Sequence, residues 1–169
     1  EIFPSVSMDL IFGWQGQTEA FLQADLDAAI ALQPDHISAY QLTIEPGTAF
    51  DRAEIRGERK AVGEDASTDF YGLIRDRLTE AGYSHYEVSN YAKPNHHSRH
   101  NMSYWKGEDY IGVGPGAHGR ITVDTDRHAT VASMQPAAYI KRVNETGIGA
   151  DKDPLNRENW GDEYIIMGL

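Results

Sequence analysis

The order of the apolar segments restricts the fold of this chain more than any other feature. Short apolar runs at residues 6–12 and 37–44 enclose a segment at 18–34 in which apolar residues recur with helical spacing. A second helical pattern at 66–81 precedes another strand pattern at 83–91. This alternation of strands and helices predicts parallel strands joined by crossovers, and therefore an α/β sheet or barrel.

The length allows only part of such a barrel. A complete eight-fold barrel takes about 250 residues, whereas this chain has 169 and shows two or three strand–helix units. We expect those units in residues 1–92, and an irregular α/β extension with the start of an accessory region in residues 93–169. Within the extension, the sequence predicts a strand at 110–113, a turn at 124–127 and a helix at 136–145.

Both ends of the sequence suggest a piece of a larger protein. The first residue is Glu1 rather than methionine, and residues 163–169 stop inside an apolar helical pattern without a cap.

Composition excludes several classes of protein. The chain has 15 Lys and Arg residues against 26 Asp and Glu residues, and its net charge of −11 argues against nonspecific electrostatic binding of nucleic acid. The chain has no cysteine, which excludes disulfides, thiolate catalysis and a cysteine-bound iron–sulfur cluster within these residues. No apolar run reaches the roughly 18 residues of a membrane span, so we expect a soluble chain.

Asp9 is the most informative position in the first strand. Alternation places it on the face opposite to Met8 and Leu10, in a strand that a parallel sheet would bury on both sides. A buried carboxylate is costly unless it is paired or hydrogen-bonded. Asp9 is therefore either a ligand contact or a structural acceptor for a backbone amide.

The second strand shows a similar division. Alternation groups the small or polar residues Ala39, Gln41 and Thr43 on one face, opposite Tyr40 and its apolar companions. Together with Asp9, this pattern predicts a barrel interior that holds a ligand rather than packed aliphatic side chains.

A glycine-rich segment at 112–119 formally matches a dinucleotide-binding motif. That motif requires a helix directly after the glycines, but residues 121–124 favour a strand, and Pro115 removes one amide. Two interpretations are left open: a loop whose backbone approaches a ligand closely, or a tight connection between strands.

The polar segment at residues 93–105 offers two further hypotheses. His96, His97 and His100 crowd together as metal ligands do, which suggests a zinc hydrolase. Pro94 indicates a loop and the segment has no acidic partner, so this is the weaker of the two hypotheses. The second hypothesis is that Arg99, His100, Asn101 or Tyr104 contacts an anion or a porphyrin. Arg and Tyr are natural partners for carboxylates.

Five segments carry a resemblance to a known family. They are SMDLIFG, PDHISAYQLTIEPGT, GYSHYEVSNYA, SRHNMSYW and YIGVGPGAH, at residues 7–13, 34–48, 82–92, 98–105 and 110–118. In the same order and over nearly the whole chain, they resemble radical S-adenosylmethionine (SAM) proteins of the oxygen-independent coproporphyrinogen III oxidase type. The RHN and YW elements with GPGAH look more like the heme-chaperone branch of that family than the decarboxylating oxidase.

The resemblance implies a part of a TIM-like barrel, cytoplasmic location, and SAM with a [4Fe-4S] cluster in the intact protein. The oxidase branch decarboxylates two porphyrinogen propionates oxidatively, using a radical made from SAM, whereas the chaperone branch binds heme and hands it to a receiving protein. The family's cysteine motif lies before residue 1, so the resemblance implies that the fragment alone is inactive. The residues 13–18 also lack the Leu-Pro that usually follows the first glycine, so this loop is expected to differ in shape.

By position in the motifs, the resemblance assigns SAM contacts to Asp9, Gln41, Thr43, Ala117 and His118. It leaves Arg99, His100 and Tyr104 for heme or another tetrapyrrole, with His100 or His118 as a possible axial ligand. The sequence therefore predicts a radical SAM protein of heme metabolism, with a non-catalytic heme-delivery protein as the alternative.

Overall fold

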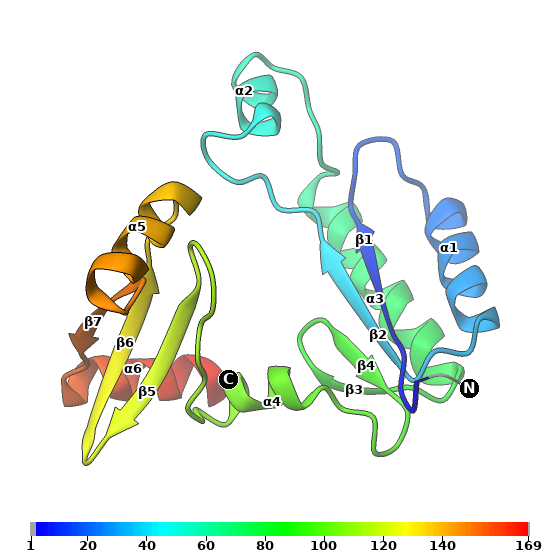
Figure 1. The fold of residues 1–169 in the computed structure, drawn as a ribbon. Coiled ribbons are helices and arrows are strands. Elements are labelled where there is room, and N and C mark those ends of the chain that lie inside the picture. Colours follow the sequence, from blue (N-terminus) through cyan, green and yellow to red (C-terminus); the bar gives the residue numbers. More distant parts are fainter. Residues whose placement is uncertain (1–2, 169) are drawn as a thin grey trace. The chain divides into compact units, whose positions relative to one another are not determined.

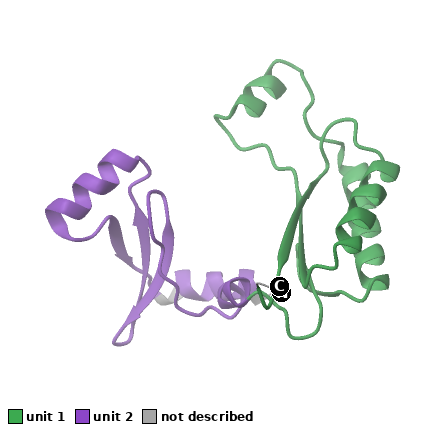
Figure 2. Cartoon of the chain, turned by 45° about the vertical axis from the view of Figure 1, so that its right-hand side comes forward, with its two compact units in different colours: residues 1–98 green, residues 99–169 purple. Residues whose placement is uncertain are grey.

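The computed structural model describes residues 3–168, and all side chains among them except those at positions 157, 158 and 168. These residues form two compact units, residues 1–98 and 99–169 (Figure 2). The boundary lies six residues after the one proposed from sequence. Residues 93–98 stay with unit 1 because Lys93 N donates to Asp35 O over 2.9 Å and Ser98 N donates to the Tyr86 hydroxyl over 3.2 Å.

Unit 1 contains a four-stranded sheet in the order β1-β2-β4-β3 (Figure 1). Its elements in chain order are β1 (Ser7–Phe12), α1 (Glu19–Ala31), β2 (His36–Gln41), α2 (Ala49–Ile55), α3 (Glu64–Glu80), β3 (Ser84–Glu87) and β4 (Asn90–Ala92). Strands β1 and β2 are parallel, as the crossover predicts.

The core of unit 1 lies between the sheet and the two long helices, α1 and α3, which cover the same face (Figure 1). Leu26 of α1, Leu78 of α3 and Ile37 of β2 are completely buried there. Thr18 begins α1 by accepting a hydrogen bond from Phe21 N. Burying apolar surface contributes about 25 cal/mol per Å², so this layer is the main source of stability for the unit.

The single strand predicted at residues 83–91 is wrong. The segment forms two short strands, β3 and β4, which turn at residues 88–89 and pair antiparallel. Strand β4 also runs antiparallel to β2. Glu87 Oε1 accepts from Ser89 N over 3.2 Å, and this local bond stabilises the turn that the apolar pattern does not reveal.

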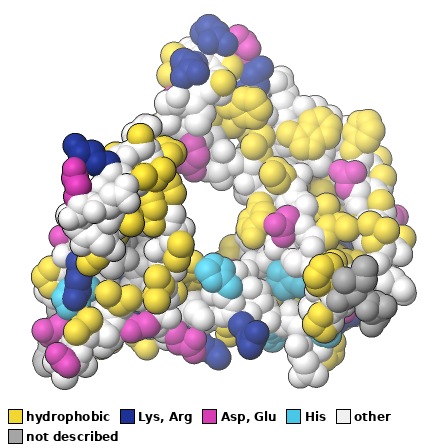
Figure 3. Space-filling view, in the orientation of Figure 1, with side chains coloured by type: hydrophobic (Ala, Val, Ile, Leu, Met, Phe, Trp, Pro, Cys, Tyr) yellow, Lys and Arg dark blue, Asp and Glu magenta, His cyan; other side chains and the backbone are white. Residues whose placement is uncertain are grey.

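The charged stretch before α3 contains the short helix α2, which the sequence did not predict. Thr48 caps it by accepting from Asp51 N, and Gly47 N donates to the Asp51 carboxylate over 2.7 Å. Lys and Arg side chains gather over this region (Figure 3), where Arg56 and Lys60 both pair with Glu58. Helix α2 is thus stabilised chiefly by its cap, with Ala53 as its buried residue, and the ion pairs lie in the segment that follows it.

Unit 2 contains an antiparallel three-stranded sheet in the order β5-β6-β7. Its elements are α4 (Arg99–Trp105), β5 (His118–Val123), β6 (Asp126–Ala132), α5 (Pro136–Thr146), β7 (Ala150–Pro154) and α6 (Arg157–Gly168). The predicted turn at 124–127 and helix at 136–145 are confirmed. The predicted strand at 110–113 is reduced to an isolated bridge between Tyr110 and Arg120.

No helix in the described part of the chain is long and apolar enough to cross a membrane.

Candidate functional site on the open face of the sheet

The face of the unit 1 sheet that α1 and α3 leave uncovered is lined by polar residues. The parallel register pairs Ser7 with His36, Asp9 with Ser38 and Ile11 with Tyr40. Met8 pairs with Ile37 on the opposite, helix-covered face. The prediction that Asp9 shares a face with Ala39 and Gln41 is therefore wrong. The alternation predicted within each strand is correct, but only the register decides which face of β1 lies beside which face of β2.

Asp9 itself is exposed, so its expected burial is wrong for this chain. No described layer covers its side of β1, so the carboxylate is in contact with solvent. Across the sheet, Asp9, Ser38 and Asn90 form one row, because Ser38 pairs with both Asp9 on β1 and Asn90 on β4. Ser38 and Asn90 are 3% and 4% exposed, and Asn90 Oδ1 is buried without a hydrogen-bond partner. The row combines a charged acceptor with a buried acceptor that a ligand could satisfy.

Next to this row, His36 anchors a buried hydrogen-bond network. Its Nδ1 lies 2.8 Å from Ser7 Oγ, and its Nε2 lies 2.7 Å from the Tyr86 hydroxyl. The Tyr86 ring also stacks on His97, with 4.3 Å between ring centroids. Burial lowers the pKa of His36 more than the nearby carboxylates of Asp9 and Glu87 raise it. His36 is therefore neutral near pH 7 and ties three segments of the open face together.

One glutamine organises the loop after β1. Gly13 has a φ of +87°, and its N–H donates to Gln17 Oε1 over 2.6 Å. The Gln17 amide nitrogen is buried without a partner. Gln41 lies close by, since a Cβ at Gly13 would sit 3.6 Å from its Cγ, and Thr43 donates to Gln41 O over 3.4 Å just beyond β2. Gln41 and Thr43 thus lie at the carboxyl end of β2, where ligands of α/β folds collect.

Ala117 and His118 lie in unit 2, at the start of β5. Ala117 O accepts from Ala132 N over 2.8 Å, and exposed His118 pairs with Val131 of β6. A strand follows the glycines, which confirms the rejection of a dinucleotide motif. The backbone of residues 118–120 packs closely against 110–112, so the segment is a tight connection between chain segments.

Arg99, His100 and Tyr104 lie on α4, a helix that the sequence did not predict. His100 and Tyr104 are one turn apart, with His100 Nε2 3.1 Å from the Tyr104 hydroxyl and 4.8 Å between ring centroids. The Tyr104 ring also meets Tyr110 edge to face at 4.4 Å. Arg99 and His100 are exposed. Helical spacing therefore places an accessible imidazole beside a phenol.

The histidine cluster does not form a metal site. His96 Nδ1 lies 3.0 Å from Ser5 Oγ, and His97 is stacked on Tyr86. Across residues 3–168, no three His, Asp or Glu side chains come together as a metal would require. The zinc hydrolase hypothesis has no support in this geometry.

The residues that sequence reasoning missed are His36, Ser38, Asn90 and Gln17. His36 and Ser38 carried a usable signal, because they alternate with buried Ile37 on β2. Asn90 carried none, since its position depends on the unpredicted hairpin.

Comparison with known proteins shows what the chain is similar to. No family model matches it. A zebrafish radical S-adenosyl methionine domain-containing protein 1, mitochondrial, is 38% identical over 97% of this chain. The heme chaperone HemW of Mycobacterium tuberculosis is 45% identical over 89% of the chain, and that of Escherichia coli is 44% identical over 81%. The chain spans about two fifths of the length of these relatives, between 35% and 40%.

A solved structure shares the fold. The coproporphyrinogen III oxidase HemN of E. coli, described as a radical SAM enzyme, superposes on 98% of this chain with a TM-score of 0.75 at 19% identity, and the match covers 40% of that protein. The expected α/β fold of a partial radical SAM barrel is confirmed. This chain belongs to the HemW-like family of radical SAM proteins.

Proposed function

We propose that this chain is the tetrapyrrole-binding portion of a heme chaperone, with unit 1 contributing a wall of the SAM site and α4 contributing the heme ligand. The observation that carries the proposal is the exposed imidazole of His100, whose Nε2 lies 3.1 Å from the Tyr104 hydroxyl. The residue before it on α4, Arg99, is also exposed. Histidine is a common axial ligand of heme iron. When His100 Nε2–H donates to the Tyr104 hydroxyl oxygen, Nδ1 carries the lone pair that iron would accept.

Arg99 supports this assignment through charge. Arg99 directly precedes His100 and is exposed, and its guanidinium suits a heme propionate, because arginine binds carboxylates with a fixed pair of donors. The relatives named heme chaperone HemW, 45% and 44% identical, favour delivery of heme over oxidation of a porphyrinogen. The partners we propose are therefore heme and a heme-receiving protein.

The open face fits a SAM molecule in its donor and acceptor groups. Asp9 supplies an exposed carboxylate for ribose hydroxyls or an ammonium, and Asn90 Oδ1 is an acceptor in need of a donor. We assign further contacts to Gln41, Thr43, Ala117 and His118 from their positions in the family motifs. When bound beside its [4Fe-4S] cluster, SAM supplies the adenosyl chemistry of the family. The cluster's thiolate ligands are absent from these residues, because the chain contains no cysteine.

The Asp9→Ala variant of the full-length protein should bind SAM about tenfold more weakly or worse, since it removes a charged hydrogen-bond acceptor. Isothermal titration of SAM into the purified protein measures the change. Asp69→Ala is the matched control, because Asp69 is an exposed carboxylate on the helix-covered side, on α3. Equal affinity of the Asp9 variant and the wild type would remove Asp9 from the site.

A hemin titration tests the heme role. The wild type should shift the Soret band on adding hemin, and His100→Ala should weaken binding by about tenfold or more, because it removes the axial ligand. His128→Ala is the control, a partly exposed histidine on β6 whose Nδ1 contacts Asp126 O. Conversion of coproporphyrinogen to a vinyl product by the reconstituted protein, without oxygen, would instead identify the oxidase.

The expected cytoplasmic location stays a prediction. Among the relatives are radical SAM domain-containing proteins of zebrafish and cattle whose names describe them as mitochondrial.

A further inference from the structure

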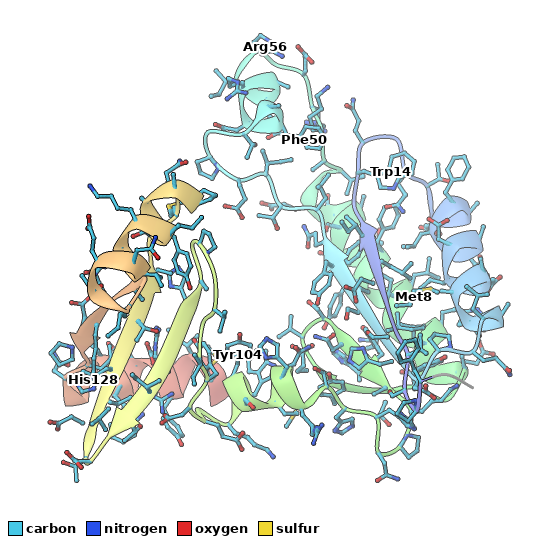
Figure 4. The ribbon with its side chains drawn as sticks, in the orientation of Figure 1. Met8, Trp14, Phe50, Arg56, Tyr104 and His128 are labelled. Atoms are coloured by element: carbon cyan, nitrogen blue, oxygen red, sulfur yellow. The ribbon has the colours of Figure 1, made fainter. Side chains whose placement is uncertain are left out.

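Unit 2 contains a pocket of about 130 Å³ that no part of the SAM site explains. Tyr104 of α4, Arg120 of β5, Arg127 of β6 and Trp160 of α6 line it, together with Tyr110. All of these elements belong to unit 2, so the pocket is complete within it. Tyr104 lies towards the C-terminal end of α4 (Figure 4).

One donor of Arg127, in the wall of the pocket, lacks an acceptor. Arg127 is 6% exposed, and its terminal nitrogens donate to Gly107 O over 2.8 Å, Asp109 Oδ1 over 3.2 Å and Glu108 O over 3.4 Å. Its Nε is buried without a partner, and its guanidinium carbon lies 5.9 Å from the centre of the Trp160 ring. An unsatisfied buried donor is costly, and more so when it is charged, so a ligand that brings an acceptor to Nε is favoured.

The other polar pair in the pocket is already satisfied. Arg120 binds Glu163 through two nitrogens, with Nε 3.0 Å and a terminal nitrogen 2.7 Å from Oε1. The other side chains of the wall are the rings of Tyr104, Tyr110, Trp160 and Tyr164, together with Glu108 and Met167. Burial raises the pKa of Tyr110, so its phenol stays neutral. The pocket therefore suits a flat, largely apolar group that carries one acceptor, such as a carboxylate.

We infer that this pocket receives one edge of the tetrapyrrole, with a propionate oxygen accepting from Arg127 Nε and the ring edge lying among Tyr104, Tyr110 and Trp160. The inference rests on the proposed heme role of α4. Tyr104 connects the two sites, because its hydroxyl lies 3.1 Å from His100 Nε2 while its ring lines the pocket. A volume of about 130 Å³ is far smaller than a porphyrin, so only an edge enters.

Metal-free protoporphyrin IX separates the pocket from the axial ligand, since it has no iron for His100 to bind. In the full-length protein, Trp160→Leu should lower the affinity for both hemin and protoporphyrin IX by about tenfold. His100→Ala should lower the affinity for hemin alone. Trp14→Leu is the matched control, because Trp14 is 40% exposed and Trp160 is 38% exposed.

The outcomes distinguish the two proposals. An unchanged protoporphyrin affinity in Trp160→Leu overturns the pocket inference, even if His100→Ala still loses hemin and the proposed function stands. If Trp160→Leu weakens protoporphyrin binding but His100→Ala leaves the affinity for hemin unchanged, the pocket inference is supported and the axial role of His100 is contradicted. If the wild type binds neither porphyrin, both fall. Should Trp160→Leu lose its circular dichroism signal, Tyr164→Ala provides a second test, since Tyr164 lines the pocket and is 54% exposed.

Discussion

Replacing Gly112 with alanine should loosen unit 2, with amide exchange in β5 and β6 accelerated by about tenfold to a hundredfold. A Cβ at Gly112 would overlap the backbone carbonyl group of His118, and backbone cannot rotate away as a side chain can. The overlap would push apart the two hydrogen bonds that join Tyr110 to Arg120, of 2.8 and 2.9 Å. Such overpacking typically costs about 1–3 kcal/mol, which is the basis of the expected exchange rates. Hydrogen–deuterium exchange followed by mass spectrometry measures the effect.

Gly161→Ala is the control for this prediction. Gly161 lies on α6, and a Cβ there would meet nothing within 4 Å. Alanine is favoured over glycine in a helix by about 1 kcal/mol, so exchange in unit 2 should be unchanged or slower. Wild-type exchange rates in β5 of the Gly112 variant would show that residues 110–112 can move without loosening the sheet.

The Leu26→Ala variant should lower the free energy of unfolding of unit 1 by about 2–5 kcal/mol. Leu26 is 0% exposed and lies in the core cluster that α1 and α3 form on the sheet. Truncation removes its apolar contacts and leaves a cavity that the two helices can close only in part. Urea unfolding followed by circular dichroism should show an earlier transition, and exchange in β1 and β2 should identify unit 1 as its source.

Leu32→Ala provides the matched comparison on the same helix. Leu32 is the C-cap of α1 and is 71% exposed, so its replacement should change stability by less than about 0.5 kcal/mol. Equal transitions for the two variants would mean that α1 contributes little to the core.

The sequence identified chemistry better than it identified contacts. His100 and Tyr104 are residue types suited to a porphyrin, although the sequence pattern predicts no helix that would join them. Their contact exists because α4 brings positions i and i+4 together. A seven-residue helix without a buried residue has too weak a pattern to be recognised from sequence.

Unit 2's pocket is the opposite case. Arg120 and Arg127 lie on neighbouring strands of a hairpin, and Trp160 comes from a helix about thirty residues further along the chain. Nothing local in the sequence marks these residues as neighbours. Only packing leaves Arg127 Nε without an acceptor, so only the structure could reveal the pocket.

The sequence by itself determined the alternation of strands and helices, and with it the parallel pair β1–β2 and the helix-covered core. Hydrophobic periodicity is a local property, and it encodes these features directly. The tertiary structure alone decided which face of β2 joins Asp9, that β4 runs antiparallel, and that Asn90 completes the polar row. Register and strand direction depend on pairing between distant segments, and a shift of one residue transfers every side chain to the other face.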